Sequence, residues 1–222
     1  TNHVHASAAV DNTPSGFNNL TATAASGAAG TAQYTIAGLG TGDTASVSTS
    51  AGSVSASSGV NGTTITFSLN ASGSGGNTTS ANITVGTTTR TFVVTTATDN
   101  TPTFNPSDFT NATEQEPSAT VTSNAITVGG INVGLSVSVS GCTVSIAGGS
   151  FVSSGTVTNG QTVTIRSTAS SSFATATNPS VTIGSTTINQ TVTTRASVTA
   201  SAPTSMTATQ STNSNNNTET VT

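Results

Sequence analysis

The amino-acid sequence predicts an all-β protein built from two tandem sandwich domains, with an extended segment at each end. Two observations carry this prediction: apolar residues alternate with polar ones in short runs, and the first half of the chain repeats in the second. The composition agrees, because β-branched residues, led by 51 threonines, make up about 36% of the chain. Such side chains fit a pleated sheet better than a helix.

Short alternating runs mark the predicted strands. Apolar and polar residues alternate at 65–69, 135–139, 142–146 and 163–165. A period of two places one set of side chains against a core and the other in water. No segment carries the i, i+3, i+4 apolar pattern of a helix, so we expect none. A strong hairpin signal precedes two of the runs, and we expect a β-hairpin at both places, Asn61-Gly62 and Asn159-Gly160.

An internal repeat sets the number of domains. The run from Asp11 to Pro14 recurs 88 residues later from Asp99, and the run from Asn61 to Phe67 recurs 98 residues later from Asn159. Each copy has the length of an immunoglobulin-like sandwich, with turn residues separating about seven short strands. We therefore predict four parts: an N-terminal extended strand at 1–10, two immunoglobulin-like domains at 11–98 and 99–195, and a C-terminal extended polar tail at 196–222.

The second repeat resembles a known group of proteins. The likeness lies in residues 123–132, 137–141, 159–166 and 192–196, and it extends more weakly to the first repeat. These runs are similar to the tandem immunoglobulin-like repeats of large bacterial surface proteins, which also occur in phage virion proteins. The resemblance implies an extracellular or virion-surface β-sandwich that serves as spacer, adhesin or building block, and it implies no catalysis. The acidic residues common at the repeat junctions of that group are reduced to Asp11 and Asp99, which argues against junctions stiffened by calcium.

Charged residues are scarce. Asp, Glu, Lys and Arg make up 5% of the chain, lysine is absent, and the cations are Arg90, Arg166 and Arg195. Three arginines cannot neutralise a row of phosphates, so we exclude nucleic acid as a partner. No apolar stretch reaches the ~18 residues of a membrane-spanning helix, so no membrane insertion is expected. No charged and apolar leader precedes Thr1, and we expect any signal peptide to have been removed.

The two terminal segments are the predicted sites of assembly. Residues 3–10 precede Asp11 as residues 91–98 precede Asp99, so they resemble the last strand of a missing domain, and the residues after Arg195 resemble a first strand. Monomeric β proteins guard their sheet edges with Lys, Pro or inward charges, and this chain has few charges to place there. We expect these segments to dock on neighbouring copies, or on other surface or virion proteins; the alternative is that they are plain linkers. The residues expected to pair alternate along the two segments: Val4, Ala6, Ala8, Val10, Val198, Ala200 and Ala202.

Side chains able to carry catalysis are few. His3 and His5 offer two metal ligands, but zinc needs three or four, so we expect an exposed polar face there. Cys142, the only cysteine, has no histidine near it in the sequence and is expected to be a core-facing small hydrophobe. The glycine-rich run at 73–77 lacks the lysine and the helix of a phosphate-binding loop. We therefore predict no enzymatic activity, no metal and no cofactor.

The carboxylates also favour structural roles. Asp11 and Asp99 each precede Asn-Thr-Pro and are expected to initiate turns through their side-chain oxygens. Glu114 and Glu116 lie in a polar segment that predicts an exposed loop rather than the carboxylate pair of a glycosidase. A calcium site at either aspartate would need more oxygens, from among Asp43, Asp108, Glu114 and Glu116.

These observations predict a non-enzymatic structural subunit of a surface assembly, either an extracellular filament or appendage or a virion decoration or fibre, held together by β-strand pairing. The alternative is an adhesin or receptor-binding module for a cell-surface glycan or protein. A binder is expected to present aromatic and arginine anchors, whereas the loops here offer mainly Gly, Ser, Thr and Asn, and Tyr34 is the only tyrosine. We favour the structural subunit and expect it outside the cell, on a cell surface or on a virion.

Overall fold

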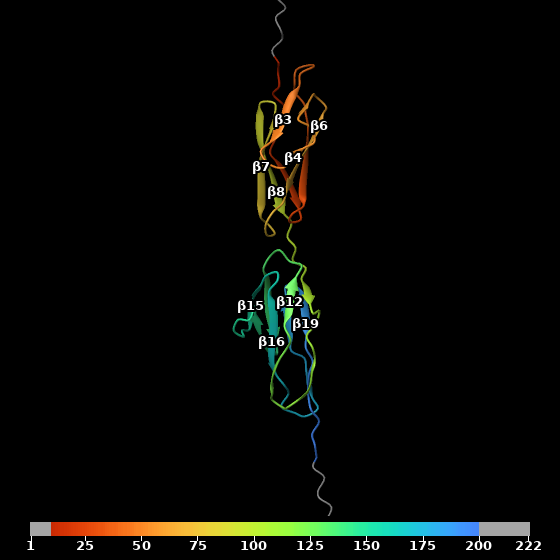
Figure 1. The fold of residues 1–222 in the computed structure, drawn as a ribbon, viewed down its shortest axis with the longest axis vertical. Coiled ribbons are helices and arrows are strands. Elements are labelled where there is room, and N and C mark those ends of the chain that lie inside the picture. The colour runs from red at the N-terminus through yellow and green to blue at the C-terminus, as the bar shows by residue number, and fades with distance from the viewer. Residues whose placement is uncertain (1–9, 200–222) are drawn as a thin grey trace, which may run out of the picture.

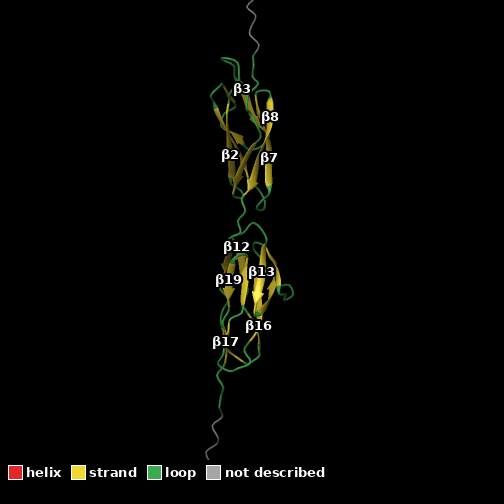
Figure 2. Ribbon diagram, turned by 180° about the vertical axis from the view of Figure 1, so that it is seen from behind, coloured by secondary structure: helices red, strands yellow, loops and turns green. Residues whose placement is uncertain are grey.

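The structure, a computed structural model, describes residues 10–199 and consists of strands and connecting loops. Figure 1 shows two β units that follow one another along the long axis, and Figure 2 shows from behind that a short loop joins them. Each unit has its own core, one formed by buried residues from Phe17 to Val94 and the other by buried residues from Phe109 to Ile188. Within the described range no helix is long and apolar enough to cross a membrane. The prediction of an all-β fold is confirmed.

The first unit is a sandwich of two sheets. One sheet has the strand order β2-β6-β4 and the other the order β1-β8-β7-β3-β5. This is the immunoglobulin-like arrangement, in which strands B, E and D of the fold face a sheet that contains strands C, F and G. Here β2, β6 and β4 are B, E and D, and β3, β7 and β8 are C, F and G. The strands are β1 (Leu20–Ala24), β2 (Ala29–Thr35), β3 (Ala45–Thr49), β4 (Ser53–Val54), β5 (Ser58–Gly59), β6 (Thr64–Asn70), β7 (Thr78–Val85) and β8 (Thr88–Thr96).

The second unit has the same plan in shorter pieces. One layer joins β9, β12, β16 and β14 in that order, and β11 also pairs with β16. The other layer has the order β15-β13-β18-β19, and β10-β20-β17 forms a separate three-stranded sheet. The strands are β9 (Thr103–Asn105), β10 (Ala112–Gln115), β11 (Thr120–Thr122), β12 (Ile126–Gly129), β13 (Leu135–Ser140), β14 (Cys142–Ile146), β15 (Ser154–Val157), β16 (Thr162–Thr168), β17 (Ala176–Thr177), β18 (Ser180–Ile183), β19 (Thr186–Asn189) and β20 (Val192–Thr194).

Alternation along the strands produces the two cores, as the sequence predicts. In β6, Ile65, Phe67 and Leu69 are buried, while the threonine and serine between them are only half-buried. In β16, Val163 and Ile165 are fully buried in the same way. The period of two therefore separates a core face from a wetter face in both units. The domain boundaries at 98/99 and at the two ends stay predictions.

The two Asn-Gly turns do not form the predicted hairpins. The second of them joins β15 to β16, but β15 pairs with β13 in one sheet, whereas β16 pairs with β14 in the other. In the first unit β5 pairs with β3, whereas β6 pairs with β2. Each turn crosses between the sheets, and its glycine N–H donates to a strand end, Gly62 to the oxygen of Ile36 (2.8 Å) and Gly160 to that of Val128 (2.7 Å). The prediction was wrong because the dipeptide fixes the local turn but not the sheet that the next strand joins.

Candidate functional site

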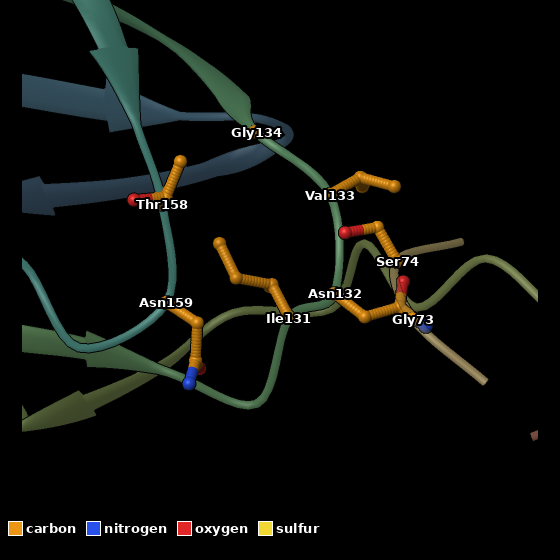
Figure 3. Close-up of a pocket in the computed structure, with 8 residues that line it drawn as sticks. All are labelled: Gly73, Ser74, Ile131, Asn132, Val133, Gly134, Thr158 and Asn159. Atoms are coloured by element: carbon orange, nitrogen blue, oxygen red, sulfur yellow. The ribbon is translucent and has the colours of Figure 1, made fainter. Parts of the chain in front are cut away.

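The loop between the two units is held by Asn132. Its Oδ1 accepts a hydrogen bond from the N–H of Asp99 (2.7 Å), and its Nδ2 donates to the carbonyl oxygen of Ala97 (2.8 Å). Its own carbonyl oxygen accepts from the N–H of Gly75, in a loop of the first unit (3.1 Å). Figure 3 shows Asn132 beside Gly73 and Ser74 of that loop. One residue of the second unit thus binds both the connecting chain and the first unit.

The first unit repeats this arrangement with different residues. The N–H of Gly40 donates to the oxygen of Asp11 (3.2 Å), as the N–H of Asn132 donates to that of Asp99 (3.0 Å). The N–H of Asp11, however, donates to the Asp43 carboxylate (2.7 Å). This carboxylate packs so closely on Gly40 that a side chain at position 40 would collide with it. A carboxylate accepts hydrogen bonds but donates none when ionised. Asp43 therefore holds Asp11 as Asn132 holds Asp99, but it cannot also donate to the preceding chain as Asn132 does.

A hollow of about 510 Å³ lies at this junction. The side chains that line it come from both units (Figure 3), and they belong to glycine, serine, threonine, asparagine, valine and isoleucine residues alone. None of these side chains ionises near neutral pH. A second hollow at the junction, of about 630 Å³, is also lined by Asp99. The hydrogen bonds of Asn132 across this junction form what we call the joint between the two units.

We expect the substitution Asn132→Asp to loosen this joint. Aspartate keeps the acceptor for the N–H of Asp99 but loses the donor to Ala97 and places a negative charge against that carbonyl oxygen. The lost hydrogen bond contributes about 1–2 kcal/mol, so amide hydrogen exchange at Asp99 and Gly75 is expected to become roughly tenfold faster. Asn159→Asp is the control, because Asn159 lines the same hollow and is exposed. Unchanged exchange at both amides would contradict this account of the joint.

Asp11 and Asp99 initiate turns, as predicted. The Oδ1 of each accepts a hydrogen bond from the N–H two residues later, that of Thr13 and that of Thr101, both at 3.1 Å. This side-chain turn is a common local structure of aspartate. Among the described residues no three or more His, Cys, Asp or Glu side chains gather where they could hold a metal ion.

Two of the seven predicted assembly residues lie in the described range. Val10 is 68% exposed and Val198 is 80% exposed. Both side chains are therefore accessible to a partner. The other candidates lie outside the described residues, and their roles stay predictions: Val4, Ala6, Ala8, Ala200 and Ala202, with His3 and His5.

The segment that holds Glu114 and Glu116 differs from the prediction. Both side chains are exposed, but Glu114 lies within β10, which pairs in parallel with β20, and not in a loop. Glu116 follows this strand, and its Oε1 accepts a hydrogen bond from Nε of Arg195 (2.7 Å). The prediction of an exposed loop holds for Glu116 and was wrong for Glu114, because the pairing partner of β10 lies about 80 residues away in the chain, where local composition gives no signal.

The described residues contain two cation–π pairs, each an arginine over a phenylalanine ring, that sequence analysis missed. The guanidinium carbon of Arg166 lies 3.9 Å from the ring centre of Phe151, and that of Arg195 lies 5.0 Å from the ring centre of Phe173. Phe173 is 43% exposed. The members of each pair are distant in sequence and meet only in the fold. Tyr34, by contrast, packs against the core with its ring 4.7 Å from that of Phe17.

Cys142 is half-buried at the margin of the second core. Its Sγ donates a hydrogen bond to the carbonyl oxygen of Ser180 (3.3 Å). Burial raises the pKa of this thiol, because removing water disfavours the thiolate, and the hydrogen bonds to backbone groups of Ser180 and Ser140 offset this in part. The predicted role as a small hydrophobe agrees with this placement.

We expect Cys142 to react slowly with iodoacetamide in the folded protein. Its raised pKa keeps the thiol protonated to a higher pH than in the unfolded chain. The alkylation rate of the folded protein should therefore rise at a higher pH than that of the protein unfolded in urea. The unfolded state then binds fewer protons in that window, and the thiol lowers stability as the pH rises from the ordinary to the raised pKa. A pH series of alkylation rates, with and without urea, measures the pKa of the thiol in the folded and in the unfolded chain. The difference between the two gives the pH dependence of stability. Equal pH profiles would contradict the burial.

The outer strands of the sheets are nearly free of charge. Each sheet ends in two outer strands, and β14 forms a further edge. In the part of the chain that the structure describes, β10 alone among these strands carries a charged residue, Glu114. None of them contains lysine or proline, the residues that commonly block pairing with another chain. The edges thus lack the usual chemical protection against strand addition.

Comparisons with known proteins give structural likenesses at low similarity. No family model matches the sequence, and a search of curated proteins finds no relative. Titin domains Z1Z2 in complex with telethonin are 13% identical over 82% of this chain and 94% of theirs, with a TM-score of 0.40. Domains 4 and 5 of the S-layer protein SbsC are 15% identical over 58% of this chain and 69% of theirs, with a TM-score of 0.31. An endo-fucoidan hydrolase, MfFcnA4, is 12% identical over 82% of this chain and 28% of its own, with a TM-score of 0.31.

Proposed function

We propose that this protein is a non-enzymatic structural subunit of an extracellular assembly, a filament, appendage, virion decoration or fibre built from copies of the chain. The observation that carries the proposal is the set of outer strands with a single charged residue among them. Charged edges keep β proteins apart, and their absence favours pairing between chains. The alternating apolar residues of the terminal segments supply strands that could pair.

The character of the surface supports the same proposal. With 5% charged residues, contacts between copies would rest on backbone hydrogen bonds and apolar side chains rather than on ion pairs. Such contacts are insensitive to salt, because screening weakens only interactions between charges. An assembly exposed to changing ionic strength outside the cell benefits from this property.

Removing residues 1–10 and 197–222 tests the proposal. We expect the full chain to form oligomers or fibres in light scattering and negative-stain electron microscopy, and the shortened chain to stay monomeric. Chains that lack only one of the two segments show which end matters. A full chain that stays monomeric at high concentration would overturn the proposal, and unchanged assembly of the shortened chain would remove the role of the segments.

The alternative function is that of an adhesin or receptor-binding module, and one observation favours it. Phe173 is 43% exposed beside Arg195, and this pair provides the aromatic and arginine anchors that binding surfaces use. Binding of the native protein and of Phe173→Ala to an array of cell-surface glycans tests this function. Specific binding that the substitution abolishes would favour it over the structural role.

A further inference from the structure

Strand β2 forms an open edge in the first unit. Within the described residues its only partner is β6, along the whole length Ala29–Thr35. Residues Ala28 and Ile36, at the two ends, direct their carbonyl oxygens to Ala71 and Gly62 on the β6 side. Bonding alternates along an antiparallel strand, so the even-numbered residues bond to β6. The odd-numbered residues direct their N–H and C=O groups to the outer side, which we call the β2 edge: Ala29, Thr31, Gln33 and Thr35.

The second unit pairs its own chain with one end of the equivalent edge. There β9 pairs with β12 in antiparallel register, from Thr103 opposite Gly129 to Asn105 opposite Thr127. The first unit has only the start of this pairing, a hydrogen bond from the N–H of Ser15 to the oxygen of Ala37 (2.8 Å). A strand therefore fits at this end of the edge. Within the described residues the rest of the edge has no outer partner in either unit, since β11 pairs with β16 alone.

The difference comes from four missing residues. Asn19 and Asn111 are equivalent, because the Oδ1 of each accepts a hydrogen bond from the closing strand, at 3.0 Å from the N–H of Thr91 and at 2.9 Å from that of Thr191. The chain covers four positions from Ser15 to Asn19 and eight from Thr103 to Asn111. The first unit thus crosses to its other sheet too early to pair with the end of β2 as β9 pairs with the end of β12.

The open position also leaves apolar side chains partly uncovered. Ala32 and Tyr34 of β2 and Leu20 and Ala22 of the neighbouring β1 pack against the first core but stay half-buried. A strand added at the β2 edge would cover them if every second side chain were small and apolar. The residues at 4–10 have this pattern, with valine or alanine at each even position and seven residues to match the seven of β2.

We propose that residues 4–10 of one copy add as an antiparallel strand to the β2 edge of another copy. The proposal rests on the proposed function and names the acceptor within it. A register with Ala6 opposite Ala32 places Val4 opposite Tyr34, so that the even-numbered side chains of both strands face the half-buried apolar seam. The same register sets the outward-directed backbone groups of Thr31 and Gln33 against Ser7 and His5 for hydrogen bonding.

Disulfide trapping between two single-cysteine chains tests the acceptor and the register. Cys142 is first replaced by serine; one chain then carries Ala6→Cys and the other Ala32→Cys. In the proposed register these two residues face each other as a pair without backbone hydrogen bonds between them. The Cα atoms of such a pair in an antiparallel sheet lie about 4.5 Å apart, which suits a disulfide. We expect the mixture to give roughly tenfold more linked dimer than Ala6→Cys mixed with Ser53→Cys on β4, because docking raises the effective concentration at Ala32 alone.

A second variant tests the edge without cysteines. Thr31→Pro removes an outward N–H and leaves the bonds to β6 in place, since proline is tolerated at an edge. We expect association at least roughly tenfold weaker than for Thr31→Val, while the circular dichroism and melting of both variants stay alike.

Three outcomes would overturn the proposal, and they are distinguishable. If the native chain assembles but Thr31→Pro assembles equally well, the acceptor is wrong and the proposed function stands. If a single chain that carries both cysteines closes its disulfide internally, residues 4–10 belong to their own domain. If the native chain stays monomeric, the proposed function fails and the acceptor with it.

Discussion

Replacing Phe67 with alanine is expected to remove about 3–5 kcal/mol from the free energy of unfolding of the first unit. Phe67 is 1% exposed in the middle of β6, and its ring stacks 6.3 Å from that of Phe17. Alanine leaves a cavity that the surrounding strands cannot close without breaking their ladders. Because small domains have only about 5–15 kcal/mol in total, the variant is expected to lie close to unfolding.

Each unit has its own spectroscopic or chemical probe for this measurement. The chain holds one tyrosine and no tryptophan, and Tyr34 packs on Phe17, so tyrosine fluorescence reports the first unit. The accessibility of the Cys142 thiol reports the second. In a urea titration of Phe67→Ala we expect the fluorescence transition to move to lower urea and the thiol transition to stay.

Val60→Ala is the matched control, because Val60 is 48% exposed. We expect it to change the stability by less than about 0.5 kcal/mol. A shift of both transitions together in Phe67→Ala would contradict two independent cores.

Local pattern was sufficient to predict the strands and the two cores, but not the partners of the strands. The buried positions of β6 and β16 follow from the period of two, because side-chain direction is a property of the single strand. The turns were harder, since Asn61-Gly62 joins different sheets whereas the less conspicuous Gly86-Thr87 joins the hairpin strands β7 and β8. Which strands pair depends on contacts between distant segments, and one sequence contains no direct record of them.

The candidate site shows the same division. The turns at Asp11 and Asp99 were predictable, because an aspartate side chain bonds to its own backbone two residues later. The role of Asn132 was not, since its partners Ala97 and Asp99 lie more than thirty residues earlier. Comparing the two repeats in the sequence would not have revealed it. Asp43 and Asn132 accept the equivalent hydrogen bond from different positions in their loops, and only the backbone hydrogen bond of Gly40 shows that the loops are equivalent.

Replacing Gly86 with alanine is expected to destabilise the first unit by roughly 2–4 kcal/mol. Gly86 occupies the first position of the two-residue turn between β7 and β8 with a φ of 56°, a left-handed conformation that alanine adopts at a cost. An added Cβ would also collide with the carbonyl oxygen of Asn12, which is backbone and cannot turn aside. The substitution therefore pushes the segment after Asp11 off the sandwich as well as straining the turn.

Gly184→Ala separates these two effects, because Gly184 holds the equivalent position between β18 and β19 with a φ of 60°. Its added Cβ would meet only the flexible side chain of Leu135, at 3.2 Å. We expect a loss of about 1–2 kcal/mol there, from the backbone conformation alone. Urea titrations followed by tyrosine fluorescence for Gly86→Ala and by thiol accessibility for Gly184→Ala give the two values. Equal losses in the free energy of unfolding would mean that the contact between Gly86 and Asn12 does not hold the segment after Asp11 on the sandwich. The segment that connects residues 4–10 to the first unit would then be free to move.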